Sequence, residues 1–113
     1  MRTEVLLNNV DASTQQIGSY QIDCGQDMRW LLMVKATGLD GTPKIYVEET
    51  TNNIDWLPLE NFKDCLDHFP LDSELVHIRD SYFMGKSIRV RIEPEDNTTG
   101  TIYSELVVKT KSN

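Results

Sequence analysis

The sequence has few cysteines, no long apolar run and little positive charge, and each shortage excludes a class of protein. Cys24 and Cys65 are the two cysteines among 113 residues. They could form one bridge, but no export signal follows Met1, so we expect reduced thiols rather than a disulfide scaffold. The longest apolar run, Trp30–Val34, is far shorter than the roughly 20 residues of a membrane-spanning helix. A membrane-spanning chain is therefore not expected.

The shortage of basic residues limits the partners. Eleven Lys and Arg residues stand against 18 Asp and Glu residues, which gives a formal net charge of −7. Such a surface repels the phosphates of nucleic acids and of anionic membranes. We therefore expect no nucleic-acid partner and no membrane partner, and instead a neutral or basic protein. The absence of a signal peptide predicts folding in a cytoplasm.

What is present is a regular succession of short β-prone runs separated by turn residues. Residues 44–51 alternate, with Ile45 and Val47 on one face and Tyr46 and Glu48 on the other. The pattern predicts one all-β domain over residues 1–113, an antiparallel β-sandwich of about seven or eight short strands. An all-β barrel is the alternative. The expected strands are Glu4–Leu7, Ile17–Ile22, Met28–Thr37, Lys44–Thr51, Trp56–Leu59, Glu74–Ile78, Lys86–Glu93 and Thr101–Lys111.

One segment has helical spacing. In Asn61–His68, the apolar residues Phe62, Cys65 and Leu66 fall at positions i, i+3 and i+4. Pro70 follows shortly after and stops a helix. We therefore expect at most one short helix.

The sequence offers no catalytic constellation, and we do not expect an enzyme, a metal or a cofactor. Gly85-Lys86-Ser87 resembles the end of a phosphate-binding loop, but Asp80 stands where that loop needs a glycine, and a strand pattern follows. No serine lies in a nucleophile-elbow pattern. Asn97-Thr98-Thr99 matches a glycosylation acceptor, and we interpret it as a polar turn.

The acidic stretch around His68 is the remaining candidate for chemistry. Asp64, Asp67 and Asp72 surround this histidine, but they lack the ligand spacing and the turn glycine of a calcium loop. A solvated acidic surface is the expected structure. A small enzyme that uses these acids is the least favoured of three hypotheses.

The most distinctive segment runs from Glu48 to Leu59, where a strand enters a polar turn, Asp55 precedes Trp56, and an extended Leu-Pro-Leu follows. This segment resembles small β-sandwich accessory structural proteins of tailed-phage virions, of the capsid-decoration, head-fibre or tail-associated type. The similarity extends from about Ser19 to Lys109. The matching runs are Lys44–Glu48, Thr51–Trp56, Leu57–Leu59, Ser87–Ile92 and Asn97–Ile102.

The resemblance implies a non-enzymatic virion protein that is assembled in the cytoplasm of a bacterial host. Its implied partners are other virion proteins and copies of itself, in a homo-oligomer. From residue type, we expect the interface to include Tyr46, Trp56, Tyr82 and Phe83. The alternative is a carbohydrate- or ligand-binding β-sandwich module in which Trp56, Tyr46 and Tyr103 form an aromatic platform.

Overall fold

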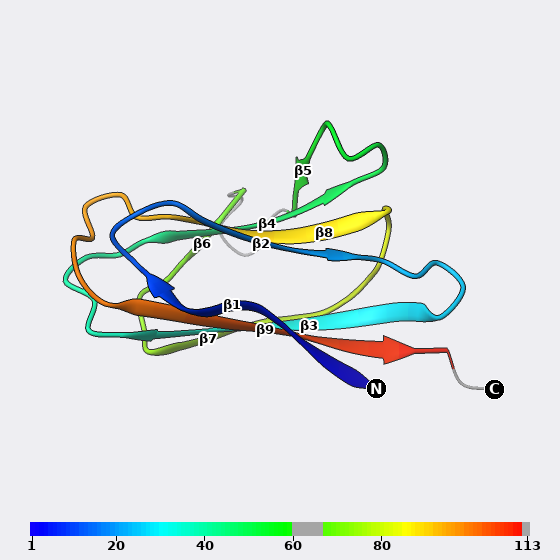
Figure 1. Ribbon diagram of the computed structural model, residues 1–113, viewed down its shortest axis with the longest axis horizontal. Coiled ribbons are helices and arrows are strands. Elements are labelled where there is room, and N and C mark those ends of the chain that lie inside the picture. Colours follow the sequence, from blue (N-terminus) through cyan, green and yellow to red (C-terminus); the bar gives the residue numbers. More distant parts are fainter. Residues whose placement is uncertain (60–66, 112–113) are drawn as a thin grey trace.

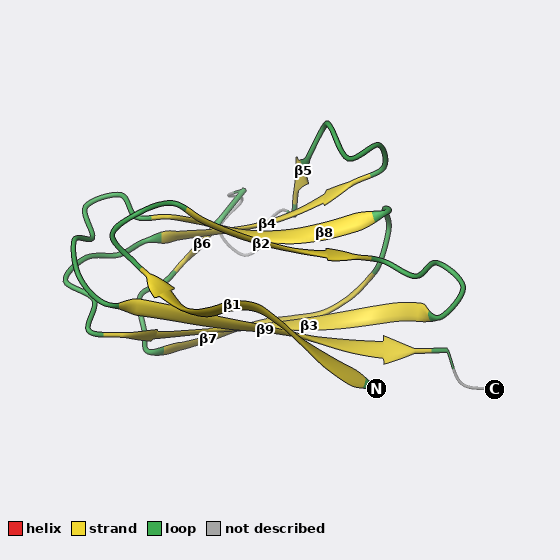
Figure 2. Cartoon of the chain, viewed as in Figure 1, coloured by secondary structure: helices red, strands yellow, loops and turns green. Residues whose placement is uncertain are grey.

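The chain folds into two antiparallel β-sheets packed face to face (Figure 1). The computed structural model describes residues 1–59 and 67–111, and only the backbone of residues 79–81. Within these ranges there are nine strands and no helix (Figure 2). The strands are β1 (Arg2–Asp11), β2 (Gln16–Gln21), β3 (Asp27–Thr37), β4 (Lys44–Thr50), β5 (Leu57–Pro58), β6 (Phe69–Pro70), β7 (Leu75–Tyr82), β8 (Ser87–Glu93) and β9 (Thr101–Thr110).

The strand order confirms the predicted sandwich. One sheet has the order β1-β9-β3-β7, and the other has the order β2-β8-β4-β5 with β6 also paired to β4. The first and last strands are neighbours, since Arg2 pairs with Val108, and β1 begins at the end of the molecule where β9 ends (Figure 1). The helix expected over Asn61–His68 falls mostly on residues outside the described ranges.

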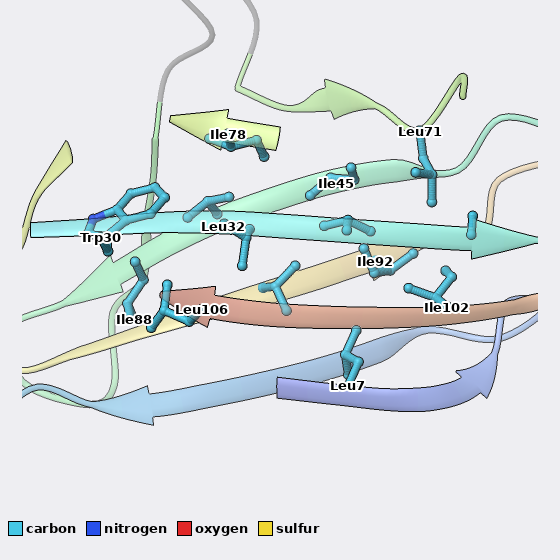
Figure 3. Packing of buried hydrophobic residues seen from close by; sticks show 14 of the residues in the cluster. Leu7, Trp30, Leu32, Ile45, Leu71, Ile78, Ile88, Ile92, Ile102 and Leu106 are labelled. Atoms are coloured by element: carbon cyan, nitrogen blue, oxygen red, sulfur yellow. The ribbon is translucent and has the colours of Figure 1, made fainter. Parts of the chain in front are cut away.

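The alternation of apolar residues produces the core. In β8, Ile88, Val90 and Ile92 are buried, as the sequence predicts. Each such side chain contributes about 1.5–3 kcal/mol when it leaves water. Figure 3 shows Ile88 beside Leu106, and Ile92 near Ile102, with Leu106 and Ile102 coming from the other sheet. The largest fully buried side chains are Trp30, Leu32, Val34, Ile45, Val47, Leu71, Ile88, Val90, Ile92, Ile102, Leu106 and Val108.

Most of the expected strands begin and end within a residue or two of the observed ones, β6 is an additional short strand, and two strands extend well beyond the expected end. We expected the first strand to end before Asn8-Asn9, but β1 continues to Asp11. Asn9 adopts a φ of 51°, and the register with β9 shifts on either side of Leu7. Bulges of this kind absorb extra residues without ending a strand. The strand expected over Glu74–Ile78 likewise continues, to Tyr82.

A buried asparagine ties together the loops at one end of the sandwich. The Asn97 amide donates to the carbonyl oxygens of Ala12 at 3.0 Å and Thr99 at 2.8 Å. Its Oδ1 accepts from the backbone amides of Asp40 at 3.0 Å and Gly41 at 2.9 Å. Asn97 is therefore the centre of a polar turn, as expected, and its amide nitrogen is engaged within the fold.

Candidate functional site

The four predicted interface aromatics lie in two separate places. Tyr46 and Trp56 lie against arginines of β8, on the face of the β2-β8-β4-β5 sheet that points away from the core. Tyr82 and Phe83 lie where β7 ends. Tyr82 is exposed, whereas Phe83 packs against the core with its ring centroid 6.2 Å from that of Tyr20. A single contact surface formed by all four stays a prediction.

Tyr46 and Trp56 belong to a network of stacked rings and paired charges. The Arg91 guanidinium carbon lies 3.9 Å from the Tyr46 ring centroid, and that of Arg89 lies 4.2 Å from the Trp56 ring centroid. Both arginines also donate to Oε1 of the buried Glu48, at 2.9 Å from Arg89 Nε and 3.1 Å from Arg91 Nε. Each of these two rings therefore already stacks against an arginine of the same chain.

The charges in this network reinforce one another. Burial lowers the pKa of Arg91, but its hydrogen bonds to Glu48 and Glu93 outweigh burial and leave that pKa raised. Burial raises the pKa of Glu93, and hydrogen bonds from Gln15 and Arg91 reverse the effect and lower it. Buried charges need such partners to remain ionised. The network joins β4 to its neighbour β8 across the outer face of their sheet.

The three-aromatic platform expected for a sugar-binding module is wrong. Tyr103 lies on β9, in the other sheet from β4, which carries Tyr46. There it lines a depression with Asn9 and Lys35, and its hydroxyl donates to Glu105. The type of a residue does not indicate to which of the two sheets its strand belongs, so the separation of Tyr103 from Tyr46 could not be predicted.

A different part of the fold forms a pocket, at the end of the sandwich opposite Asn97. We call it the end pocket. It has a volume of about 200 Å³ and lies between the two sheets, beside the β4–β5 and β7–β8 connections. Its lining is mainly apolar, and Glu49 is its one ionisable acid. The lining residues are Trp30, Val47, Glu49, Thr50, Thr51, Leu57, Pro58, Leu59, Tyr82, Met84 and Gly85.

Two turns of specific composition build the lip of the end pocket. Asn52 Oδ1 accepts from the amides of Ile54 at 2.9 Å and Asp55 at 2.8 Å. On the other connection, a Cβ at Gly85 would lie 2.4 Å from the Thr50 carbonyl oxygen, closer than atoms can approach. Glycine is needed there because β8 begins against the end of β4. This explains the Gly85-Lys86-Ser87 sequence as a tight turn into a strand.

Glu49 places a carboxyl group on the face of β4 that points toward the core. Because side chains alternate along a strand, Glu49 shares its face with Ile45 and Val47. Burial raises the pKa of this carboxyl, and hydrogen bonds from the Met84 and Gly85 amides oppose the rise without cancelling it. The Met84 amide lies 2.8 Å from Oε2. The alternation of β4 was a signal that could have identified Glu49 from sequence.

Trp30 brings a hydrogen-bond donor to the same pocket. Its side chain is 1% exposed, and a hydrogen bond from its indole to the Glu49 carboxyl also opposes the rise in the pKa of that group. Figure 3 shows Trp30 at one end of the core. The indole and the acid therefore lie next to each other at the end pocket.

The rim of the end pocket is apolar and open to solvent. Met84 is 82% exposed, Leu57 is 71% exposed and Tyr82 is 56% exposed. These side chains surround the opening from two connections that are distant in sequence. Grouped apolar exposure of this kind is typical of a contact surface, whereas scattered apolar residues are ordinary.

The expected acidic stretch around His68 is only partly described. Across residues 1–59 and 67–111, no three His, Cys, Asp or Glu side chains gather as they would around a metal ion. His68 pairs with Asp67 at 3.1 Å, while Asp64 and Cys65 lie outside those ranges. Cys24 is a free, exposed thiol. No helix in the described part of the chain has the length and hydropathy needed to span a membrane.

Comparisons with known proteins leave the family open. No protein-family model and no curated protein matches the chain. Among solved structures, the chain is similar to one described as "CBM4 structure and function", at 14% identity and a TM-score of 0.38. The match covers 86% of this chain and 61% of the other. An identity and a TM-score this low identify neither a family nor a ligand for this chain.

Proposed function

We propose that this chain is a non-catalytic, ligand-binding β-sandwich module that takes one ring-sized group into the end pocket. The observation that carries the proposal is the end pocket itself, a mainly apolar hollow of about 200 Å³ whose rim residues Leu57, Tyr82 and Met84 are exposed. Grouped apolar exposure around a hollow is typical of a binding surface. A ligand that binds only the folded chain also raises its stability.

The size of the end pocket supports a ring as the bound group. An apolar cavity of about 150 Å³ is known to admit benzene, and this pocket measures about 200 Å³. A six-membered ring with a small substituent therefore fits inside. Full burial of a ring of this size contributes roughly 1.5–3 kcal/mol. We expect weak binding of isolated rings and stronger binding of ligands that also cover the rim.

Tryptophan fluorescence tests this function directly. The Trp56→Phe variant leaves Trp30, on the pocket wall, as the sole tryptophan. We would titrate it with single-ring probes: cyclohexanol, N-acetyltyrosinamide, N-acetylphenylalaninamide and methyl β-glucopyranoside. We expect a saturable change in Trp30 emission with at least one probe.

Two matched variants locate the binding. Leu57→Ala removes an exposed side chain from the rim and is expected to weaken binding. Leu75→Ala removes an exposed leucine of the other sheet, outside the end pocket, and is expected to change nothing. If no probe alters Trp30 emission, the end pocket is not a ligand site.

Docking on a phage particle is the second candidate function. It is supported by the sequence resemblance and by the exposed apolar rim formed by Leu57, Tyr82 and Met84. In this role the chain binds other virion proteins and copies of itself, assembles in a bacterial cytoplasm, and engages neither nucleic acid nor membrane. Mass measurement by light scattering tests self-association. A monomer at millimolar concentration would count against this role.

A further inference from the structure

We propose that two copies of this chain dock through the outer face of the β1-β9-β3-β7 sheet, around Met33. We call this surface the dimer face, and its sheet is the lower layer in Figure 1. The proposal goes beyond the ligand-binding function above and does not use the end pocket. Its basis is a group of apolar side chains on the solvent side of a sheet whose other side already covers the core.

Strand pairing places Met33 at the centre of the dimer face. Residues directly opposite each other on paired strands point to the same side of a sheet. Met33 lies opposite Glu105 of β9 and His77 of β7, while its neighbours Leu32 and Val34 along β3 are buried in the core. Met33 and its partners therefore point away from the core. The apolar and aromatic side chains of the dimer face come from all four strands and are Val5, Leu31, Met33, Leu75, Tyr103 and Val107.

The sequence of β3 is typical of a strand that is covered on both sides. A strand with one wet face alternates apolar and polar residues, whereas a strand buried on both faces has a continuous apolar run. Residues 30–34 of β3 are all apolar. The inward members of this run fill the core, but Leu31 and Met33 are only half-buried in the single chain. At the margins of the dimer face, Val5 is 52% exposed and Leu75 is 47% exposed. A partner on this face covers the second side of β3.

The outer face of the other sheet differs in both respects. The outward positions of β8 there are all polar, from Ser87 to Glu93. The guanidinium groups of Arg89 and Arg91 stack on aromatic rings and bind Glu48. The charges of that face are therefore paired within the chain, and its composition suits contact with water.

The charges of the dimer face favour a second copy as the partner. The whole chain carries a net charge of −7, so two copies repel each other in most orientations. Among the described side chains that point outward from this sheet, three basic residues stand against two acidic ones, a net charge of +1. They are Arg29, Lys35 and Lys109 against Asp11 and Glu105. Two copies can therefore approach through this face without strong repulsion.

A two-fold dimer can also pair Lys35 with Glu105 across the interface. Glu105 lies opposite Met33 on β9, and Lys35 lies two residues from Met33 along β3, so both charges border the same central side chain. In a two-fold dimer, a residue i that contacts residue j of the partner is contacted in turn by the partner's i through its own j. With the axis near Met33, each Lys35 meets the Glu105 of the other copy, and the two Met33 side chains meet each other.

The dimer face is large enough for a specific dimer. Three of its four strands have ten or more residues. With strands about 4.8 Å apart and residues about 3.4 Å apart along a strand, the face covers roughly 600 Å² on each copy. Two such faces bury about 1,200 Å², above the roughly 1,000 Å² that a specific interface needs and below the standard of about 1,600 Å². We therefore expect a specific dimer of modest affinity.

Charge reversal at Lys35 and Glu105 tests this dimer, with sedimentation equilibrium as the measurement of mass. Lys35→Glu and Glu105→Lys each place like charges together twice across the interface, so each variant alone is expected to associate at least about tenfold more weakly than the natural chain. Mixed in equal amounts, the two variants form a heterodimer in which both pairs have opposite charges, and association is expected to return. Lys86→Glu makes the same change of net charge at an exposed lysine between β7 and β8, and is expected to leave the dimer intact.

Rescue on mixing supports the dimer face and also shows that both variants fold, because an unfolded chain is not rescued by another. A natural chain that stays monomeric at about 1 mM overturns the proposal. So does a dimer that Lys35→Glu and Glu105→Lys leave intact, or one that Lys86→Glu weakens equally. Folded variants that lose association and do not recover it on mixing overturn it as well.

A second variant covers the case in which a charge reversal disturbs folding. Met33→Gln keeps the length of the side chain and removes its apolar contact at the centre of the dimer face, so it is expected to weaken association. Association that is unchanged in folded Met33→Gln overturns the proposal. Because the end pocket lies outside the dimer face, the proposed ligand-binding function stands or falls separately, on the Trp30 titration.

Discussion

Replacing Asn97 by alanine is expected to destabilise the fold strongly, although this residue lies in a loop. The change removes two donated and two accepted hydrogen bonds that join three loops. At about 0.5–1.5 kcal/mol for each bond, the loss is roughly 2–6 kcal/mol. Water can reach the exposed Asp40 amide after the change, so we expect a value of about 2–4 kcal/mol. That is a large fraction of the stability of a typical domain.

Urea unfolding followed by circular dichroism measures this loss. The unfolding midpoint should fall while the slope with denaturant stays the same, since the same surface is exposed on unfolding. Asn8→Ala serves as the control, because Asn8 is exposed and its side chain accepts a hydrogen bond from its neighbour Asn9; its effect should stay within about 0.5 kcal/mol. If Asn97→Ala also falls within that range, the buried amide does not hold the loops together.

Three further substitutions test the pocket and the network beside it. Glu48→Ala leaves Arg89 and Arg91 without their shared acceptor and is expected to cost about 1.5–3 kcal/mol by urea unfolding; an unchanged midpoint would show that this network is not stabilising. Because the pKa of Glu49 is raised in the fold, the folded state binds its proton more tightly than the unfolded chain does, and stability is lost as pH rises from the unfolded pKa through the folded one. Glu49→Gln removes that loss, so its Tm relative to the natural chain should be higher at pH 7 than at pH 4, and an equal difference at both pH values would refute the shift. Gly85→Ala forces its Cβ against the Thr50 carbonyl and is expected to cost more than about 1 kcal/mol; thermal unfolding of this variant beside Gly25→Ala, whose Cβ would approach only the flexible Asp23 side chain, isolates the steric effect, and equal Tm values would contradict it.

The sequence predicts the sandwich well because its strands are strongly alternating. In β8, every second residue is β-branched and apolar, and that period alone places Ile88, Val90 and Ile92 in a core. The first strand was predicted too short because Asn8-Asn9 is typical of a turn. A bulge at this point is stabilised by pairing with β9, a contact with residues about 100 positions away. Local propensity does not contain that information.

The candidate site was harder to predict, because it depends on which strands become neighbours. The alternation of β4 places Glu49 inside, and this signal was present in the sequence. By contrast, the stacking of Arg89 on Trp56 requires the β4–β8 register, and the separation of Tyr103 from Tyr46 requires the division into two sheets. The hydrogen bond between Trp30 and Glu49 joins β3 of one sheet to β4 of the other, so it too depends on how the two sheets pack.

The central claim is that the end pocket binds a ligand, and the indole N–H resonance of Trp30 reports on it most directly. Titration of the ¹⁵N-labelled Trp56→Phe variant with each of the four single-ring probes is expected to shift this resonance, and to saturate, with at least one of them. The backbone resonances of Glu49 and Met84 should follow the same curve. An indole resonance that stays in place, while resonances elsewhere move or none move, would contradict the claim.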